Sequence, residues 1–177
     1  IRIHVKGLTG GHSGMDIHKG RGNANKIMNR ILFSTNEKFS IQLSSIDGGS
    51  LRNAIPRESV ADLAIAANNS AALVAFVKEL ADILKKENHT TDSNLSIDVQ
   101  SIDAPAKVMS SDFQRNFLRS VYACPNGIYR MSPDIKDLVQ TSNNVARILL
   151  KEGSYTIQCL TRSAVDSEKM DLAQSIQ

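Results

Sequence analysis

The chain has 177 residues, of which 41% are apolar, so it is long enough for one domain or two small ones with a substantial core. Its 21 basic and 18 acidic residues are interspersed and leave a formal net charge of +3, which argues against a nucleic-acid partner. No apolar run approaches the length of a membrane span and no signal peptide is present, so we expect a cytoplasmic domain without a membrane partner.

The first hundred residues alternate between strand and helix patterns. Alternating apolar and polar residues predict strands, with the side chain of His4 on the solvent face of the first strand. Apolar residues spaced three and four apart predict two amphipathic helices, and Lys85 and Lys86 close the second one against its dipole. The predicted elements are, in order, a strand at 1–6, a helix at 24–32, strands at 39–43 and 61–65, a helix at 73–84 and a strand at 95–99.

This βαββαβ order predicts an α+β fold over residues 1–103. The order favours a ferredoxin-like, four-stranded antiparallel sheet with both helices on one face. Such a fold by itself names no function. The chain opens inside a strand pattern and ends inside a helical one, which suggests a segment of a longer protein.

Residues 104–177 carry a different pattern, which predicts an αββα extension. Its first helix begins where Ser111 can act as the cap, and its last helix is expected to have Asp166 or Ser167 as its cap. Two strands, at about 137–150 and 154–163, are expected to join in a hairpin through Lys151-Glu152-Gly153-Ser154. The extension either continues the first sheet, giving one continuous domain, or builds a second one.

The metal-ligating residue types are too sparse for a metal site. Cys124 and Cys159 stand alone, without ligand spacing, and are expected as buried, reduced thiols. Asp16 and His18 offer two ligands, but no third or fourth follows at workable spacing. No paired carboxylates in apolar sequence offer a general acid and base. We therefore predict neither a metal site nor a complete catalytic centre within this chain.

A glycine-rich turn, Gly10–Gly14, places His12 between a strand and a helix start, where a tightly bent backbone exposes the imidazole. Ser13 is disfavoured as a nucleophile, because the G-x-S-x-G spacing fails and no Asp/His order supports a triad. A phosphate cradle at Gly20–Asn23 lacks a third glycine and a Walker lysine. Two interpretations of His12 stay open: a donor to a developing oxyanion, or a loop histidine bonded to a backbone carbonyl.

Two further polar residues lie where they could hold a substrate. Asn53 occupies a bend between a glycine pair and Pro56, where an asparagine is commonly only a turn former. Arg162 ends the strand at 154–163 and could grip a carboxylate with two hydrogen bonds. An exposed arginine at a strand end is nevertheless the commoner case, so the local patterns favour a structural interpretation of both residues.

Four stretches, in the same order and across most of the chain, resemble the lid segment of the aminoacyl-histidine dipeptidases, a branch of the co-catalytic zinc peptidases. The stretches are GLTGGHSGMDIHKGRGNANK, IDGGSLRNAIPRE, LVQTSNNVARI and CLTRSAVDSEK. The first is long and specific, since it separates these dipeptidases from relatives that share only a shorter G-H-x-G pattern.

The resemblance implies a lid and dimerisation domain that closes over a dipeptide substrate, with Xaa-His dipeptides the expected class. It also implies a separate catalytic domain with two zinc ions, no activity in this chain alone, and a homodimer. Within the lid, His12 matches a histidine that stabilises the oxyanion of the attacked peptide carbonyl. Asn53 matches an asparagine that contacts the substrate, and Arg162 an arginine that binds its terminal carboxylate.

Two other classes of protein stay open. The first is a free-standing ferredoxin-like module that binds a small molecule or a like subunit; a start codon just before Ile1 and a stop codon after Gln177 would favour it. The second is a purely structural pairing domain, in which an exposed sheet edge or helix face self-associates. Such a domain would dimerise whatever residues replaced His12, Asn53 and Arg162.

Overall fold

The computed structural model describes residues 1–151 and 153–177. Its strands are β1 (Arg2–Lys6), β2 (Gly11–His12), β3 (Gln42–Gly48), β4 (Ala54–Ile55), β5 (Ser59–Ala64), β6 (Ser96–Gln100), β7 (Gly127–Met131), β8 (Val139–Lys151) and β9 (Ser154–Ser163). Its helices are α1 (Ala24–Phe39), α2 (Ser70–Asn88), α3 (Ser111–Ala123) and α4 (Asp166–Ile176), with short 3₁₀ turns η1 (Ile17–Lys19) and η2 (Ala67–Asn69). Within the described residues, no helix is both long and apolar enough to cross a membrane.

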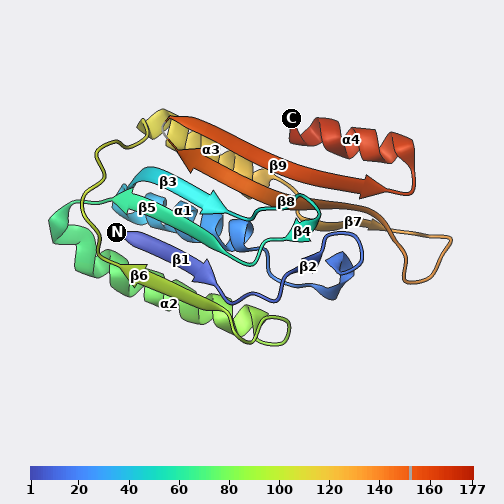
Figure 1. The fold of residues 1–177 in the computed structure, drawn as a ribbon, viewed down its shortest axis with the longest axis horizontal. Coiled ribbons are helices and arrows are strands. Elements are labelled where there is room, and N and C mark those ends of the chain that lie inside the picture. The colour runs from blue at the N-terminus through green and yellow to red at the C-terminus, as the bar shows by residue number, and fades with distance from the viewer. Residues whose placement is uncertain (152) are drawn as a thin grey trace.

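Seven of the strands form one antiparallel sheet in the order β6-β1-β5-β3-β8-β7, and β9 also pairs with β8 (Figure 1). Helix α1 packs against both α2 and α3, and these three helices cover one face of the sheet. The other face is open, and the small β2–β4 ribbon lies at one end of it. The predicted α+β class, with a βαββαβ core and an antiparallel sheet, is confirmed.

The core forms between the sheet and the helices because both present apolar faces there. In β1, Ile3 and Val5 are fully buried, whereas Arg2 points to the open face and pairs with Asp62 of β5 at 2.7 Å. Helix α1 buries its apolar positions as the spacing predicts, and burying each large aliphatic side chain stabilises the fold by about 1.5–3 kcal/mol. His4 lies on the open face as expected, with its side chain 30% exposed.

The extension joins the first sheet, because Ile46 of β3 pairs with Leu150 of β8. The predicted strand at 137–150 is β8, which begins at Val139, and the predicted strand at 154–163 is β9. These two strands pair as far as Lys151 and Ser154, as a hairpin requires, while Glu152 of the connecting turn lies outside the described residues. Two predicted caps are displaced by one position or more. Ser111 is the first residue of α3, whose cap is Ser110, and Asp166 is the first residue of α4, whose cap is Val165.

Strand β7 has no counterpart among the predicted elements. It pairs with the first half of β8 through two register shifts, and its side chains are mostly exposed, including those of Ile128, Tyr129 and Met131. A strand exposed on both faces has no burial difference to impose the apolar–polar alternation by which strands are recognised. The strand conformation of β7 therefore depends on its pairing with β8, and the local sequence does not reveal it.

Candidate functional site

An open depression of about 1080 Å³ lies on the sheet face opposite to the helices, next to the β2–β4 ribbon. Strand β2 contributes His12 to its lining, and the turn that leads into β4 contributes Asn53. Polar side chains from the open face complete it, among them Asp47 of β3 and Asp62 of β5. His12 and Asn53, which lie in separate sequence motifs, therefore border one concave surface.

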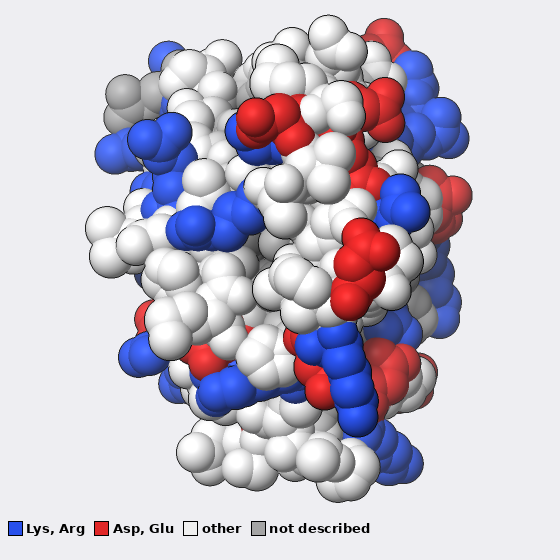
Figure 2. Space-filling view, turned by 90° about the vertical axis from the view of Figure 1, so that its right-hand side faces the viewer, with Lys and Arg blue, Asp and Glu red and all other residues white. Residues whose placement is uncertain are grey.

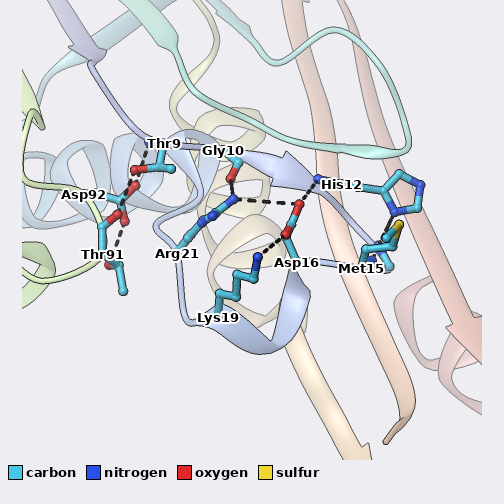
Figure 3. Close-up of polar contacts among 10 residues, drawn as sticks. Thr9, Gly10, His12, Met15, Asp16, Lys19, Arg21, Thr91 and Asp92 are labelled. Carbon is cyan, nitrogen blue, oxygen red and sulfur yellow. Dashed lines mark hydrogen bonds and ion pairs between the residues drawn. The ribbon is translucent and has the colours of Figure 1, made fainter.

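The turn that carries His12 is held by the carboxylate of Asp16. Its Oδ2 accepts a hydrogen bond from the His12 backbone N–H at 2.8 Å, and its Oδ1 lies 2.7 Å from Lys19 Nζ (Figure 3). The hydrogen bond from Lys19, followed by the one from the His12 amide, lowers the pKa of Asp16 to about 2. Arg21 completes the turn by donating from Nη1 to the Gly10 carbonyl at 2.6 Å.

This packing also explains the glycine before His12. Gly11 has φ +142°, and a Cβ there would lie 2.6 Å from Arg21 Nη1 and 2.7 Å from Asp16 Oδ2. Only glycine leaves room for the cation and the carboxylate beneath the turn. Asp16 and Arg21 therefore hold the backbone next to His12 on one side of the turn. The His12 side chain points away from them, toward Met15 (Figure 3).

The imidazole of His12 is oriented by two backbone amides. Its Nδ1 accepts hydrogen bonds from the N–H of Gly14 at 3.2 Å and of Met15 at 3.1 Å. A ring nitrogen that accepts carries no proton, so in the neutral imidazole this network assigns the proton to Nε2. Nε2–H has no partner among the described residues, and the ring bonds no backbone carbonyl. His12 therefore presents one neutral, unoccupied donor.

Arg162 lies on the other side of the same turn. A Cβ at Gly14 would be 3.2 Å from His12 Cε1 and 3.3 Å from Arg162 Nε, so both side chains border the small volume above this glycine. Arg162 is half-buried, its Nε is shielded from solvent, and its guanidinium has no hydrogen bond or ion pair within the described part of the chain. A half-buried cation with all donors unused is a ready site for an anion, above all a carboxylate.

Asn53 is positioned through its backbone. Its carbonyl accepts a hydrogen bond from the Ser13 N–H at 2.9 Å, and Ala54 next to it pairs with His12 across the ribbon. The side-chain amide is exposed and makes no hydrogen bond to any described residue, so it does not form the local turn bond expected of a mere turn former. The amide is free to meet a ligand in the depression.

A buried asparagine that the motifs did not single out supports this turn. Asn144 of β8 is 1% exposed, and its Nδ2 donates to the carbonyls of Arg52 at 3.2 Å and Ala54 at 2.8 Å. Asn23, which caps α1 through its Oδ1, donates in turn to Asn144 Oδ1 at 3.3 Å. The sequence did offer a signal for Asn144. Asparagine is depleted from strands, so two consecutive asparagines, Asn143 and Asn144, inside a predicted strand indicate a specific role.

Asp92 supports the site from the loop after α2. It is 1% exposed, and its Oδ1 accepts a hydrogen bond from the backbone N–H of Thr9 at 2.8 Å (Figure 3). Its Oδ2 accepts one from the backbone N–H of Gly22 at 2.7 Å, on the other side of the His12 turn. Thr91 adds a hydroxyl donor at 2.8 Å. Asp92 stands in a polar loop where an aspartate is common, so no local signal pointed to it.

The described residues contain no group of three or more His, Cys, Asp or Glu side chains that could hold a metal ion. Asp16 is already engaged by Lys19 and by the His12 amide, and His18 is exposed. The donor set for zinc is therefore not met by this part of the chain.

Charge at this end of the molecule is mixed. Figure 2 shows acidic and basic side chains interspersed with uncharged surface on the end where the β2–β4 ribbon and β7 lie. The described residues on this face form no continuous basic patch of the kind that binds a nucleic-acid backbone.

Comparison with known proteins identifies the class. Residues 3–92 match the sequence model of the peptidase dimerisation domain, and the chain belongs to this family. It is 39% identical over 169 residues to the cytosol non-specific dipeptidase of Escherichia coli (strain K12), covering 96% of this chain and 35% of that protein. The structure matches aminoacylhistidine dipeptidase from Vibrio alginolyticus with a TM-score of 0.97 and 38% identity, covering 99% of this chain and 36% of that one.

The resemblance inferred from the four sequence stretches is thereby confirmed. The chain spans about a third of the length of both dipeptidases.

Proposed function

We propose that this chain is the substrate-covering and dimerisation domain of a cytoplasmic, zinc-dependent dipeptidase that hydrolyses Xaa-His dipeptides, and that it is inactive alone. The observation that carries the proposal is the pair of unused donors around Gly14, Nε2–H of His12 and the guanidinium of Arg162. The names of the two relatives support the reaction class, a dipeptidase, and the Vibrio relative supports the histidine preference.

A dipeptide offers the two anionic groups that such a pair of donors fits. Its peptide carbonyl becomes an oxyanion when attacked, and its terminal carboxylate is one residue further on, about 4 Å away along the backbone. Nε2–H of His12 stabilises the oxyanion and acts most strongly in the transition state, where the negative charge develops. Arg162 binds the carboxylate with two parallel hydrogen bonds and so aligns the dipeptide.

Asn53, in the turn that leads into β4, adds a hydrogen bond to the bound dipeptide. Its amide can both donate and accept, so it can pair with a backbone N–H or carbonyl of the substrate. The described residues do not supply a zinc ligand set, so the two zinc ions of the proposed enzyme belong to a separate catalytic domain. This domain partners that catalytic domain and, as its family indicates, a second copy of itself.

The test is hydrolysis of β-alanyl-histidine by the full-length dipeptidase that contains this chain. The His12→Ala variant is expected to lower kcat by about 10²–10³, because one oxyanion donor is lost. The matched control is His18→Ala, which removes an exposed imidazole from the neighbouring 3₁₀ turn and should leave kcat unchanged. Turnover of the His12→Ala variant within about threefold of wild type would contradict the oxyanion role.

A second arm tests the carboxylate. Arg162→Met should raise KM for β-alanyl-histidine by about 30–100-fold while hardly changing KM for the C-terminal amide, which lacks the negative charge. Arg115→Met removes an exposed arginine of α3 that pairs with Asp112, and it should change neither value. Equal effects of Arg162→Met on both substrates would contradict the assigned contact.

The same measurements test the alternative class of protein. If the full-length protein binds the dipeptide but does not hydrolyse it, the result would favour the binding module over the dipeptidase.

A further inference from the structure

A pair of cysteines lies on the helix side of the sheet, away from the depression with His12. Cys124 follows the last residue of α3, Cys159 lies in β9, and their sulfur atoms are 3.7 Å apart. The expectation of buried thiols is wrong, since each residue is only half-buried. The two thiols are in contact, although no spacing motif in the sequence links them. Both line a groove of about 710 Å³ between α3, β9 and α4, which gives small solutes access.

The geometry suits a disulfide bond. The sulfurs are already in van der Waals contact, and a bond requires them to approach to about 2.05 Å. Cys159 is fixed in the sheet by pairing with Val145, whereas Cys124 has left the helix and has extended backbone (φ −57°, ψ 121°) before Pro125. Rotation of the Cys124 side chain, with a small shift of this loop residue, can therefore close the gap without disturbing the strands.

The surroundings favour one thiolate. Lys26 Nζ donates to the carbonyls of Val121, Tyr122 and Cys124 at 2.7–2.9 Å, so a cation sits beside the pair. The hydrogen bond between the two sulfurs, with the Asn143 amide and the charge of Lys26 contributing, lowers the pKa of Cys159 to about 7. The same hydrogen bond raises the pKa of Cys124, because removing its proton would place a second negative charge beside the first. Cys159 is then a nucleophile near neutral pH.

We propose that Cys124 and Cys159 form a peroxide-sensitive dithiol, which closes reversibly into an intramolecular disulfide. The thiolate of Cys159 attacks one oxygen of hydrogen peroxide; the S–O bond forms, the O–O bond breaks, and the leaving hydroxide takes up a proton to become water. The sulfur of Cys124 then attacks the resulting sulfenic acid, forming the S–S bond and breaking the S–O bond. A second water leaves with the Cys124 proton, and each disulfide formed reduces one peroxide.

This modification is independent of the proposed dipeptidase function. The disulfide ties the end of α3 to β9, the strand that also carries Arg162. Side chains alternate along a strand, so Cys159 faces the helices while Arg162, three residues on, faces the opposite side. The cross-link therefore constrains the strand from the face opposite the candidate site.

The test oxidises the 177-residue chain with hydrogen peroxide and measures the intact mass and the cross-linked peptides. The expected product is a monomer that has lost two hydrogen atoms, with residues 124 and 159 in one linked peptide, and dithiothreitol restores the original mass. Cys124→Ser and Cys159→Ser cannot form the bond, and Cys124→Ser should stop at a sulfenic acid that dimedone traps. The disulfide should form at least about tenfold faster in the folded chain than in urea, where the sulfurs are no longer held together.

Three outcomes would overturn the proposal. They are a disulfide between two chains, over-oxidation of either cysteine to sulfinic acid in place of the cross-link, and no linkage in the folded chain at a peroxide concentration that oxidises both thiols in urea. The result with the wild-type chain decides the question even if a serine variant fails to fold.

Discussion

His12 and Arg162 come from opposite ends of the chain and meet across Gly14, where an added Cβ would lie 3.2 Å from one side chain and 3.3 Å from the other. Among the described residues, neither Nε2–H of His12 nor the guanidinium of Arg162 has a hydrogen-bond partner. The glycine is therefore part of the candidate site, since it determines how closely a ligand can approach both donors. Four predictions follow from this and the neighbouring contacts.

Gly14→Ala should impair the site and leave the fold intact. The added methyl is closer than ordinary van der Waals contact to both side chains, so turnover of the dipeptidase should fall about tenfold as the donors are displaced. Gly20→Ala is the matched control: that glycine has φ +66° with open space around it, so alanine there should cost about 1 kcal/mol of stability without changing turnover. Urea denaturation and steady-state kinetics on both variants check the contrast, and equal turnover of the two variants would contradict it.

Asp92→Asn should destabilise the fold through the His12 turn. The carboxylate accepts hydrogen bonds from Thr9 and Gly22, and an amide can replace only one of its two oxygens, leaving a buried backbone N–H facing an NH₂ group. The expected loss is about 2–3 kcal/mol in the free energy of unfolding. Asp82→Asn, at an exposed position of α2, should change it by less than about 0.5 kcal/mol. A loss of similar size in both variants would rule out this role of Asp92.

The Asp16 carboxyl should make the His12 turn sensitive to acid. Its pKa is lowered from 3.8 to about 2, first by the hydrogen bond from Lys19 and then by the His12 amide. A carboxyl whose pKa is depressed by folding stabilises the folded state fully above its unfolded pKa, and this contribution is lost as the pH falls toward 2. The chemical shift of the His12 amide proton should titrate with a midpoint near pH 2 in wild type and should not titrate in Asp16→Asn. A wild-type midpoint near 4 would show that the carboxyl does not hold the amide.

Asn144→Ala should loosen the turn that carries Asn53. The variant leaves the carbonyls of Arg52 and Ala54 without their donor, at a cost of about 1–3 kcal/mol. Hydrogen exchange of the Ser13 amide, which donates to the Asn53 carbonyl, should accelerate about tenfold. The adjacent Asn143→Ala instead removes a donor to the Pro125 carbonyl, at 2.7 Å, so exchange at Ser13 should stay slow. Acceleration in both variants would indicate general destabilisation.

The main features of the fold follow from local patterns. Alternation in β1 and β5 and apolar spacing in α1 and α2 mark elements that present one face to the core, and burial enforces such patterns wherever one face is solvated. Strand β7 lacks that asymmetry and was missed. The attachment of β8 to β3 was left open, because pairing between distant strands depends on edge geometry that no single segment encodes.

The candidate site divides in the same way. The glycine-rich turn around His12, the bend at Asn53 and the strand-end Arg162 were visible as residues suited to holding a ligand, since short-range backbone chemistry determines turns. The local patterns did not show that Nδ1 of His12 is occupied, or that Arg162 beside it has no partner among the described residues. They also did not show that Asn144 and Asp92 support the turns, or that Cys124 and Cys159 are in contact. Each of these depends on which side chains the folded backbone brings within a few ångströms, and only the tertiary structure decides that.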